Sequence, residues 1–135
     1  MNKPKLVPEF YCFDLKQSLN FYVKFLGFSI KYQRPEENFV YLELEGVEIM
    51  LEEYLAGKDR IWETGALERP LGRGVNFQIE IRDTKKLYER LKTNEIDIYH
   101  DLECKTYRVG KENITQHQFL VQDPDGYLLR FCSVE

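Results

Sequence analysis

The stretch Asp14-Leu15-Lys16-Gln17-Ser18-Leu19 decides the fold, because it has a counterpart about half a chain later. The counterpart, Asp83-Thr84-Lys85-Lys86-Leu87-Tyr88, follows it by 69 residues in a chain of 135. Each stretch begins an amphipathic segment with an aspartate that can accept hydrogen bonds from the free amides of a first helical turn. Gly27 and Asn94 end the two segments, and both residue types tolerate the left-handed conformation of helix ends. The repeat therefore predicts two equivalent helices.

Apolar and polar residues alternate on both sides of each helix, which is typical of strands. This alternation predicts strands over residues 6–13, 28–33, 39–44 and 47–54 in the first half, and over residues 75–82, 98–103, 115–122 and 127–134 in the second. Turn signals at Glu45-Gly46 and at Asp123-Pro124-Asp125-Gly126 indicate that the last two strands of each half form a hairpin. Each half is therefore predicted to run strand, helix, strand, strand, strand.

We expect one α+β domain over residues 1–135, built from two βαβββ modules. Module one covers about residues 5–55, a linker about 56–73, and module two about 74–135, with a second loop over 105–113. One helix covers only one face of a module's sheet. Two modules side by side can form one curved mixed sheet with the helices outside and a concave cup inside.

Composition and charge exclude several classes of protein. Hydrophobic residues make up 43% of the chain, which is enough for a packed core, and the net charge of −4 argues against a nucleic-acid-binding face. No apolar run is long enough to span a membrane, and the first residues lack the apolar stretch of a signal peptide. Three cysteines without paired spacing indicate reduced thiols and a cytoplasmic location.

Strand alternation also predicts which side chains line the cup. The inward set consists of Glu9, Tyr11, Glu52, Asn76, Gln78 and Arg130. Glu52 and Arg130 either hold a polar ligand or form an ion pair with each other. Asn76 and Gln78 either bind a ligand amide or simply line a wet cavity.

Other residues have two interpretations as well. Trp62, the only tryptophan, either stacks on a ligand or at a subunit contact, or anchors the linker over the core. His100 and His117 are better explained as strand residues than as acid–base groups. Tyr107 and Arg108 lie in the second predicted loop and either close over a ligand or form a surface hairpin. No residue has the sequence context of a nucleophile with its base, so we assign no catalytic residue.

The order of motifs resembles the glyoxalase/bleomycin resistance/dioxygenase superfamily, also called vicinal oxygen chelate, and in particular its bleomycin-resistance-protein-like branch. The resemblance covers nearly the whole chain and rests on Pro8-Glu9-Phe10-Tyr11, Asp14-Leu15, Ser18-Leu19-Asn20-Phe21-Tyr22, Leu26-Gly27-Phe28, Ile49-Met50-Leu51-Glu52 and the hairpin from Gln118 to Phe131. It implies the glyoxalase/bleomycin resistance fold. It does not fix one activity, because this fold serves isomerases, dioxygenases, thiol transferases and metal-free binding proteins.

Enzymes of this superfamily hold a divalent metal with four side chains, one from the first and one from the last strand of each module. In this sequence the four positions correspond to Val7, Glu52, Asn76 and Arg130. Valine has no donor atom and arginine is a permanent cation, so only Glu52 is a good ligand. We therefore expect no metal ligands and no cofactor.

The resemblance implies a metal-free protein that sequesters a drug or metabolite, as bleomycin resistance proteins do, which makes antibiotic resistance a candidate role. The expected ligand-binding residues are Glu9, Tyr11, Glu52, Trp62, Asn76, Gln78 and Arg130. A homodimer is expected, because cups of this superfamily are often completed across a two-fold axis; no nucleic acid or membrane is expected as a partner. The alternatives are a metal-dependent lyase, isomerase or dioxygenase of the same superfamily, and a protein that uses the cup as an interaction surface.

Overall fold

The computed structural model describes residues 4–57 and 62–134 and divides the chain into two compact units. The first unit runs up to Leu71 and includes Pro124–Gly126; the second consists of Gly72–Asp123 and the chain from Tyr127 onward. Each unit contains one βαβββ module, so the predicted α+β fold is confirmed. The strands are hydrogen-bonded as two open four-stranded mixed sheets, one in each module.

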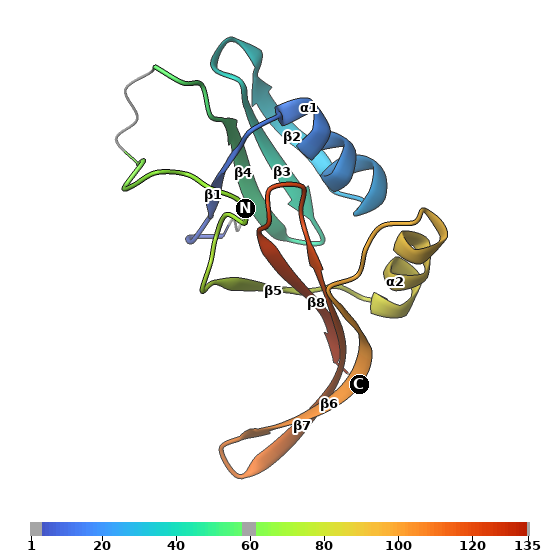
Figure 1. Ribbon diagram of the computed structural model, residues 1–135. Helices are drawn as coiled ribbons and strands as arrows, with labels where there is room; N and C mark the ends of the chain where they lie inside the picture. The colour runs from blue at the N-terminus through green and yellow to red at the C-terminus, as the bar shows by residue number, and fades with distance from the viewer. Residues whose placement is uncertain (1–3, 58–61, 135) are drawn as a thin grey trace. The chain divides into compact units, whose positions relative to one another are not determined.

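Module one has its strands in the order β1-β4-β3-β2, with β1 parallel to β4 and the other pairs antiparallel (Figure 1). Its elements are β1 (Glu9–Cys12), α1 (Leu15–Leu19), the π-helix η1 (Asn20–Phe25), β2 (Ser29–Arg34), the 3-10 helix η2 (Pro35–Glu37), β3 (Phe39–Leu44) and β4 (Val47–Glu53). The β3–β4 turn has positive φ at both Glu45 and Gly46, as a two-residue hairpin turn requires.

The first helix begins as predicted and continues differently. The Asp14 side chain accepts a hydrogen bond from the Gln17 amide at 3.1 Å, and the Glu53 carboxylate accepts one from the Leu15 amide at 2.8 Å. After five α-helical residues the chain becomes a π-helix, in which the Leu26 amide donates to the Phe21 carbonyl at 3.0 Å. A 3.6-residue period cannot anticipate this wider turn.

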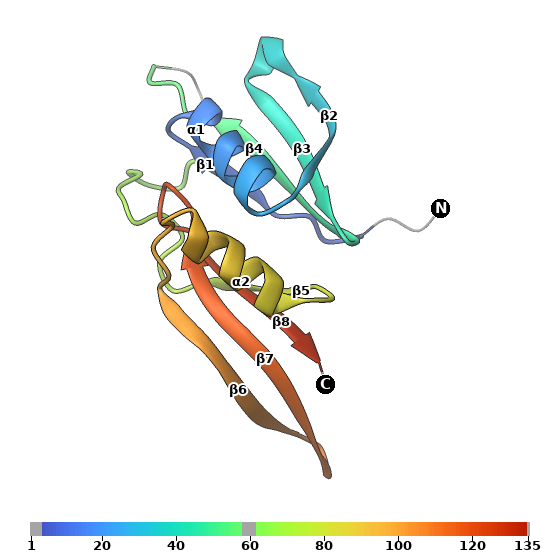
Figure 2. The same cartoon turned by 90° about the vertical axis from the view of Figure 1, so that its right-hand side faces the viewer.

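Module two repeats the arrangement with its own sheet, in the order β5-β8-β7-β6 (Figure 2). Its elements are β5 (Asn76–Glu80), α2 (Thr84–Thr93), β6 (His100–Val109), β7 (Glu112–Gln122) and β8 (Leu128–Val134). Asp83 caps α2 by accepting from the Lys86 amide at 3.0 Å, so Asp14 and Asp83 occupy equivalent helix starts, as predicted. The left-handed residue after α2 is Glu95 and not the predicted Asn94, because Asn94 instead donates from its side chain to the Arg90 carbonyl.

Each module buries its core on the side of its sheet that carries the helix. In module one this core includes Phe10, Tyr22, Leu26, Phe28, Val40, Leu42, Ile49 and Leu51, and in module two Ile79, Leu87, Leu91, Phe119, Val121, Leu129 and Phe131. Cys12 and Cys132 are buried free thiols within this packing. Among the described residues no helix is long and apolar enough to cross a membrane.

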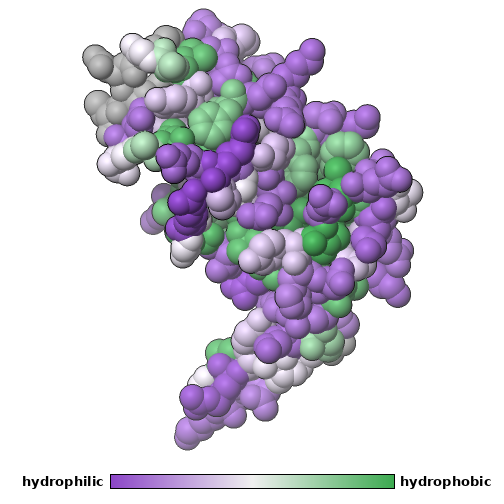
Figure 3. Space-filling model, viewed as in Figure 1, coloured by the Kyte–Doolittle hydropathy of each residue, from purple (hydrophilic) through white to green (hydrophobic). Residues whose placement is uncertain are grey.

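The predicted loop over 105–113 is wrong. Strands β6 and β7 instead continue through this region, with pairs from Lys105↔Gln116 to Val109↔Glu112. The Thr106 and Thr115 hydroxyls lie 2.8 Å apart across the two strands, and β-branched pairs of this kind favour a strand over a loop. The far end of this hairpin is mostly hydrophilic in Figure 3, which explains why the apolar alternation ended early.

The β7–β8 turn belongs to the first unit. Asp125, which is 1% exposed, accepts hydrogen bonds from the Arg69 guanidinium at 2.9 Å and from the Phe13 amide at 3.3 Å. Its backbone carbonyl accepts from the Leu71 amide at 2.8 Å. Gly126 has φ +106, and a Cβ atom there would lie 2.5 Å from the Pro70 Cα. This turn therefore requires both the glycine and the aspartate.

Candidate functional site

The helix-free side of the module-one sheet brings three predicted site residues together. Tyr11 and Glu52 are direct partners in the parallel β1–β4 pair, and Glu9 is the partner of Met50. Phe10, which alternates with them, is buried. We call this side of the sheet face one. Its two central rows are Glu9, Met50, Tyr41, Tyr32 and Tyr11, Glu52, Phe39, Arg34.

A buried carboxylate lies on face one beyond the predicted residues. The side chain of Glu48 is 6% exposed; Tyr41 donates its hydroxyl to Glu48 Oε1 at 2.5 Å, and Lys31 Nζ lies 3.1 Å from Oε2. The hydrogen bond to Glu48 is the main reason why the pKa of Tyr41 rises to about 12. Glu48 is therefore held at both side-chain oxygens.

An aromatic stack extends face one to its edge strand. The rings of Tyr32 and Tyr41 are stacked with centroids 4.7 Å apart, and Tyr32 remains 46% exposed. The Arg34 guanidinium lies 3.9 Å from the centre of the Phe39 ring and 5.9 Å from that of Tyr32. Such an exposed ring beside a cation is suited to stacking on a planar group.

Sequence analysis missed this half of face one for a physical reason. The run Phe39-Val40-Tyr41-Leu42 is apolar on both faces, so alternation gave no sign that Tyr41 and Phe39 share a face with Glu52. A bulge between Ile30 and Tyr32 also shifts the register of β2.

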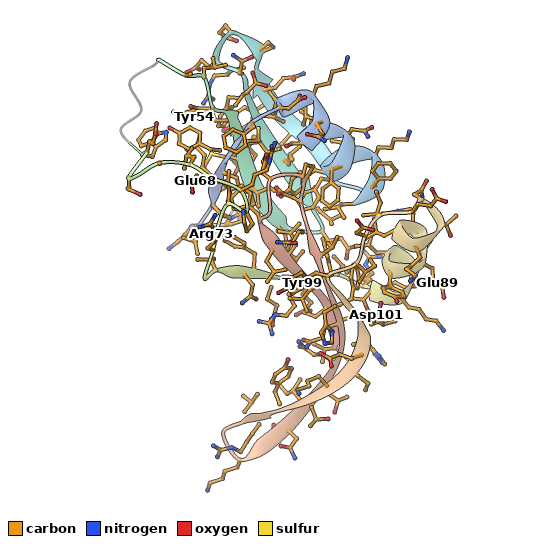
Figure 4. All side chains as sticks on the ribbon, in the orientation of Figure 1. Tyr54, Glu68, Arg73, Glu89, Tyr99 and Asp101 are labelled. Carbon is orange, nitrogen blue, oxygen red and sulfur yellow. The ribbon has the colours of Figure 1, made fainter. Side chains whose placement is uncertain are left out.

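The linker end of module one contributes Tyr54 and Trp62. Tyr54, labelled in Figure 4, packs edge-on against Tyr11 with centroids 5.8 Å apart, and its hydroxyl donates to Glu63 at 3.3 Å. The Glu63 carboxylate is the main cause of the raised pKa of Tyr54. Trp62 is 56% exposed, and its predicted roles over a ligand, at a subunit contact or over the core stay predictions.

The helix-free side of the module-two sheet, face two, carries the other predicted residues. Gln78 is the direct partner of Arg130 in the parallel β5–β8 pair, and Asn76 is the partner of Leu128 one step along. Asn76 and Gln78 are exposed, whereas the alternating Ile79 is buried. The predicted alternation of β5 is therefore confirmed.

Arg130 has an unusual environment on face two. Its Nε atom is buried and has no hydrogen-bond partner in the described part of the chain. Within residues 4–57 and 62–134, no ion pair involves it. Cys132 lies on the same face, and burial is the main cause of its raised pKa, with Glu80 raising it further and Arg130 opposing both.

A polar network follows Arg130 toward the β6 edge of face two. The Gln118 side-chain amide donates to Glu103 at 2.9 Å and to the Tyr107 hydroxyl at 2.8 Å, and Gln116 donates to the Gln118 carbonyl oxygen at 2.8 Å. Tyr107 therefore belongs to a strand and not to a loop that closes over a ligand, and the same correction applies to Arg108.

The two histidines lie away from these groups. His100 is exposed, and its Nδ1 lies 3.0 Å from the Asp101 carbonyl oxygen. His117 is half-buried on the helix side of its sheet, opposite Cys104. Figure 4 labels Tyr99 and Asp101 at the start of β6, where Asp101 accepts from the Tyr88 hydroxyl of α2 at 2.9 Å.

Comparison with known proteins establishes the family. The sequence profile of the Glyoxalase/Bleomycin resistance protein/Dioxygenase superfamily matches residues 7–131. The chain belongs to this superfamily. A superfamily member from Vibrio splendidus 12B01 is 47% identical, with 94% of this chain and 95% of that chain covered and a TM-score of 0.44. No curated protein matches the sequence.

More distantly similar solved structures share the fold. A glyoxalase/bleomycin resistance protein/dioxygenase from Alicyclobacillus acidocaldarius is 24% identical with a TM-score of 0.64, and the match covers 99% of this chain and 95% of that one. TioX from Micromonospora sp. ML1 is 18% identical with a TM-score of 0.69, covering 95% and 96% of the two chains.

The strand register relates the superfamily metal positions of the two modules. Glu9 and Gln78 are 69 residues apart, and their partners are Met50 and Arg130, so Met50 is the module-one counterpart of Arg130. The counterpart of Glu52 is Cys132, because their partners Tyr11 and Glu80 are also 69 residues apart. Glu52 and Arg130 are therefore not equivalent in register, and Met50 stands beside Glu52 as the module-one position.

These positions do not fit the divalent metal of the superfamily enzymes, whichever residue of β4 is taken. Val7 has no donor atom, Asn76 offers one amide oxygen and Arg130 is a permanent cation, so the Glu52 carboxylate would be the one good ligand and the Met50 thioether a poor one. Among residues 4–57 and 62–134, no group of three or more His, Cys, Asp or Glu side chains could hold a metal ion. We therefore derive no chemical step through a metal.

Proposed function

We propose that this protein binds and sequesters a small molecule without a metal, in the manner of bleomycin resistance proteins. Face one carries the proposal, because it combines a buried carboxylate with an exposed aromatic stack. Glu48 supplies a buried carboxylate that Lys31 and Tyr41 hold in place, and the Tyr32 ring supplies an open stacking surface. A planar ligand with a cationic group matches both features.

The chemistry of the remaining groups supports binding rather than catalysis. The residues at the superfamily metal positions offer no adequate ligand set, and the Glu48 carboxylate on face one already accepts hydrogen bonds from Tyr41 and Lys31. Face one is therefore a preorganised recognition surface, which is the usual character of small-molecule sites with a few fixed polar groups.

The test is a thermal-shift screen of the purified protein with bleomycin-type glycopeptides and planar cationic aromatic compounds, followed by calorimetry on each hit. Tyr32→Ala should weaken binding several-fold, because stacking contributes about 0.5–1.5 kcal/mol beyond buried area. Tyr99→Ala is the matched control, since Tyr99 is exposed but lies in module two before β6. A hit with equal affinity for both variants would place the ligand elsewhere, and no hit in a broad screen would favour an interaction surface.

We further propose that the protein is a cytoplasmic homodimer with a role in antibiotic resistance. Three free cysteines support a reducing compartment. Sedimentation equilibrium tests the dimer, because a monomer at micromolar concentration would contradict it. Growth of expressing cells in bleomycin tests resistance, with the Tyr32→Ala variant as the matched control.

A further inference from the structure

We propose that Arg130 and Gln78, with Asn76 beside them, form an oxyanion-binding subsite on face two that takes the carboxylate or phosphate group of a small molecule. The inference rests on the proposed function only in taking the protein to bind small molecules, and it makes no use of face one. It concerns module two alone. The position that binds a metal cation in superfamily enzymes would thus bind an anion here.

The first argument is the environment of Arg130. Its Nε is buried and has no hydrogen-bond partner among the described residues. A buried cationic donor without a partner is unfavourable, and such groups are normally paired or bound. The planar guanidinium fork matches the two oxygens of a carboxylate or the oxygens of a phosphate, with which it forms bidentate hydrogen bonds.

The second argument is the pair of amides next to it. Gln78 is the register partner of Arg130 on the neighbouring strand, and Asn76 lies on the same face two residues earlier. Neighbouring strands are about 4.8 Å apart, so the Gln78 amide and the guanidinium can reach one bound group. Both amides are exposed and can donate two hydrogen bonds each.

The acidic groups of face two do not take the place of the anion. Glu80 lies one step along β5, opposite Cys132, and makes no ion pair with Arg130. Glu103 accepts a hydrogen bond from Gln118 at 2.9 Å. Cys132 is the other titratable neighbour, and burial is the main cause of its raised pKa. Because none of these described groups pairs with Arg130, we infer that the partner of its cation is an anionic group of a bound small molecule.

The experiment follows the Arg130 Nε–H resonance by ¹H–¹⁵N NMR during titration with inorganic phosphate and, separately, with acetate, at ionic strength held constant with sodium chloride. The resonance is assigned by its loss in Arg130→Met. We expect saturable movement of this resonance with at least one anion, and the anion that saturates at lower concentration identifies the source chemistry. At ten times the dissociation constant, Tm should rise by roughly 5 °C.

Matched variants separate this site from general salt effects. Arg130→Met should abolish the Tm rise, Arg130→Lys should weaken anion binding tenfold or more because it loses the fork, and Gln78→Ala should weaken it several-fold. Arg108→Met makes the same charge change on the opposite side of the sheet and should behave as the wild type. Glu80→Gln should leave anion binding intact or strengthen it.

Three results would overturn the inference. They are an unmoved Nε–H resonance with both anions, an equal Tm rise in Arg130→Met, and a loss of stability in Glu80→Gln that shows Glu80 to be the partner. A screening hit that lacks an anionic group and binds the wild type and Arg130→Met equally would also overturn it, while leaving small-molecule binding itself intact.

Discussion

Replacing Tyr41 with phenylalanine tests the buried carboxylate of face one. The substitution removes the hydroxyl that donates to Glu48 at 2.5 Å and leaves a carboxylate of 6% side-chain exposure with Lys31 at 3.1 Å. A hydrogen bond to a charged group contributes about 1.5–3 kcal/mol. We therefore expect the free energy of unfolding at pH 7 to fall by about 2 kcal/mol.

The same contact predicts a pH dependence with a definite sign. The pKa of Tyr41 is about 12 in the fold, above its ordinary value of 10.0. The contribution is therefore fully present below about pH 10 and is lost as the pH rises toward 12. A pKa shift of two units corresponds to at most about 2.7 kcal/mol of folding free energy. Solvent around the partly exposed Lys31 side chain screens the Glu48 charge and reduces this contribution to about 1–2 kcal/mol.

Urea unfolding followed by circular dichroism measures both effects. Tyr88→Phe is the matched control, because the Tyr88 hydroxyl bonds Asp101 at 2.9 Å at an exposed site, where less than about 1 kcal/mol is expected. The reasoning is refuted if the two variants lose equal stability at pH 7, or if the difference between wild type and Tyr41→Phe stays constant from pH 10 to 12.

Three further predictions concern other parts of the chain. Gly126→Ala should destabilise the protein by more than about 3 kcal/mol, because the added Cβ would lie 2.5 Å from the Pro70 Cα. Gly110→Ala is the control, since the space around Gly110 is open and the substitution should cost only about 1–2 kcal/mol of backbone strain. Thermal melts of the two variants measure the difference. Asp83→Ala should lower the unfolding free energy by about 1 kcal/mol through loss of the α2 cap, measured by urea unfolding; an unchanged midpoint would contradict that role. Protein purified without added metal should contain substoichiometric nickel, zinc, iron and manganese by mass spectrometry, and a full equivalent that disappears in Glu52→Ala would show that the donor set had been misjudged.

Local signals were sufficient for most of the fold. The aspartates at 14 and 83, the Glu45-Gly46 turn and the alternation of β5 each act through neighbouring residues, so sequence predicted them correctly. The π-helix η1 and the long β6–β7 hairpin were missed. The first differs from an α-helix only in its hydrogen-bond spacing, and the second is polar near Thr106 and Thr115, where strand pairing rather than hydrophobicity holds the chain.

The site was predictable only where alternation was clean. Glu9, Tyr11 and Glu52 were placed on one face correctly, because buried residues alternate with them. The stack of Tyr32 on Tyr41 depends on register across a bulge, which no single strand reveals. The counterpart of Arg130 likewise required the measured register, since a two-residue displacement along β4 leaves the side chain on the same face.

The Asp125 turn makes completion of the first unit depend on a stretch of chain that is synthesised long after the rest of that unit. The Phe13 amide and the Asp125 carboxylate that accepts from it are separated by 112 residues in sequence. During synthesis on the ribosome, the Arg69 guanidinium and the Leu71 amide therefore cannot donate to the Asp125 carboxylate and carbonyl until residue 125 has been made. A fragment that ends before this turn would retain the four strands of module one but would lack its final closure. If the two halves of the repeat were separated, the amino-terminal half would therefore lose hydrogen bonds of its own unit, because the Asp125 turn that accepts them lies in the other half of the sequence.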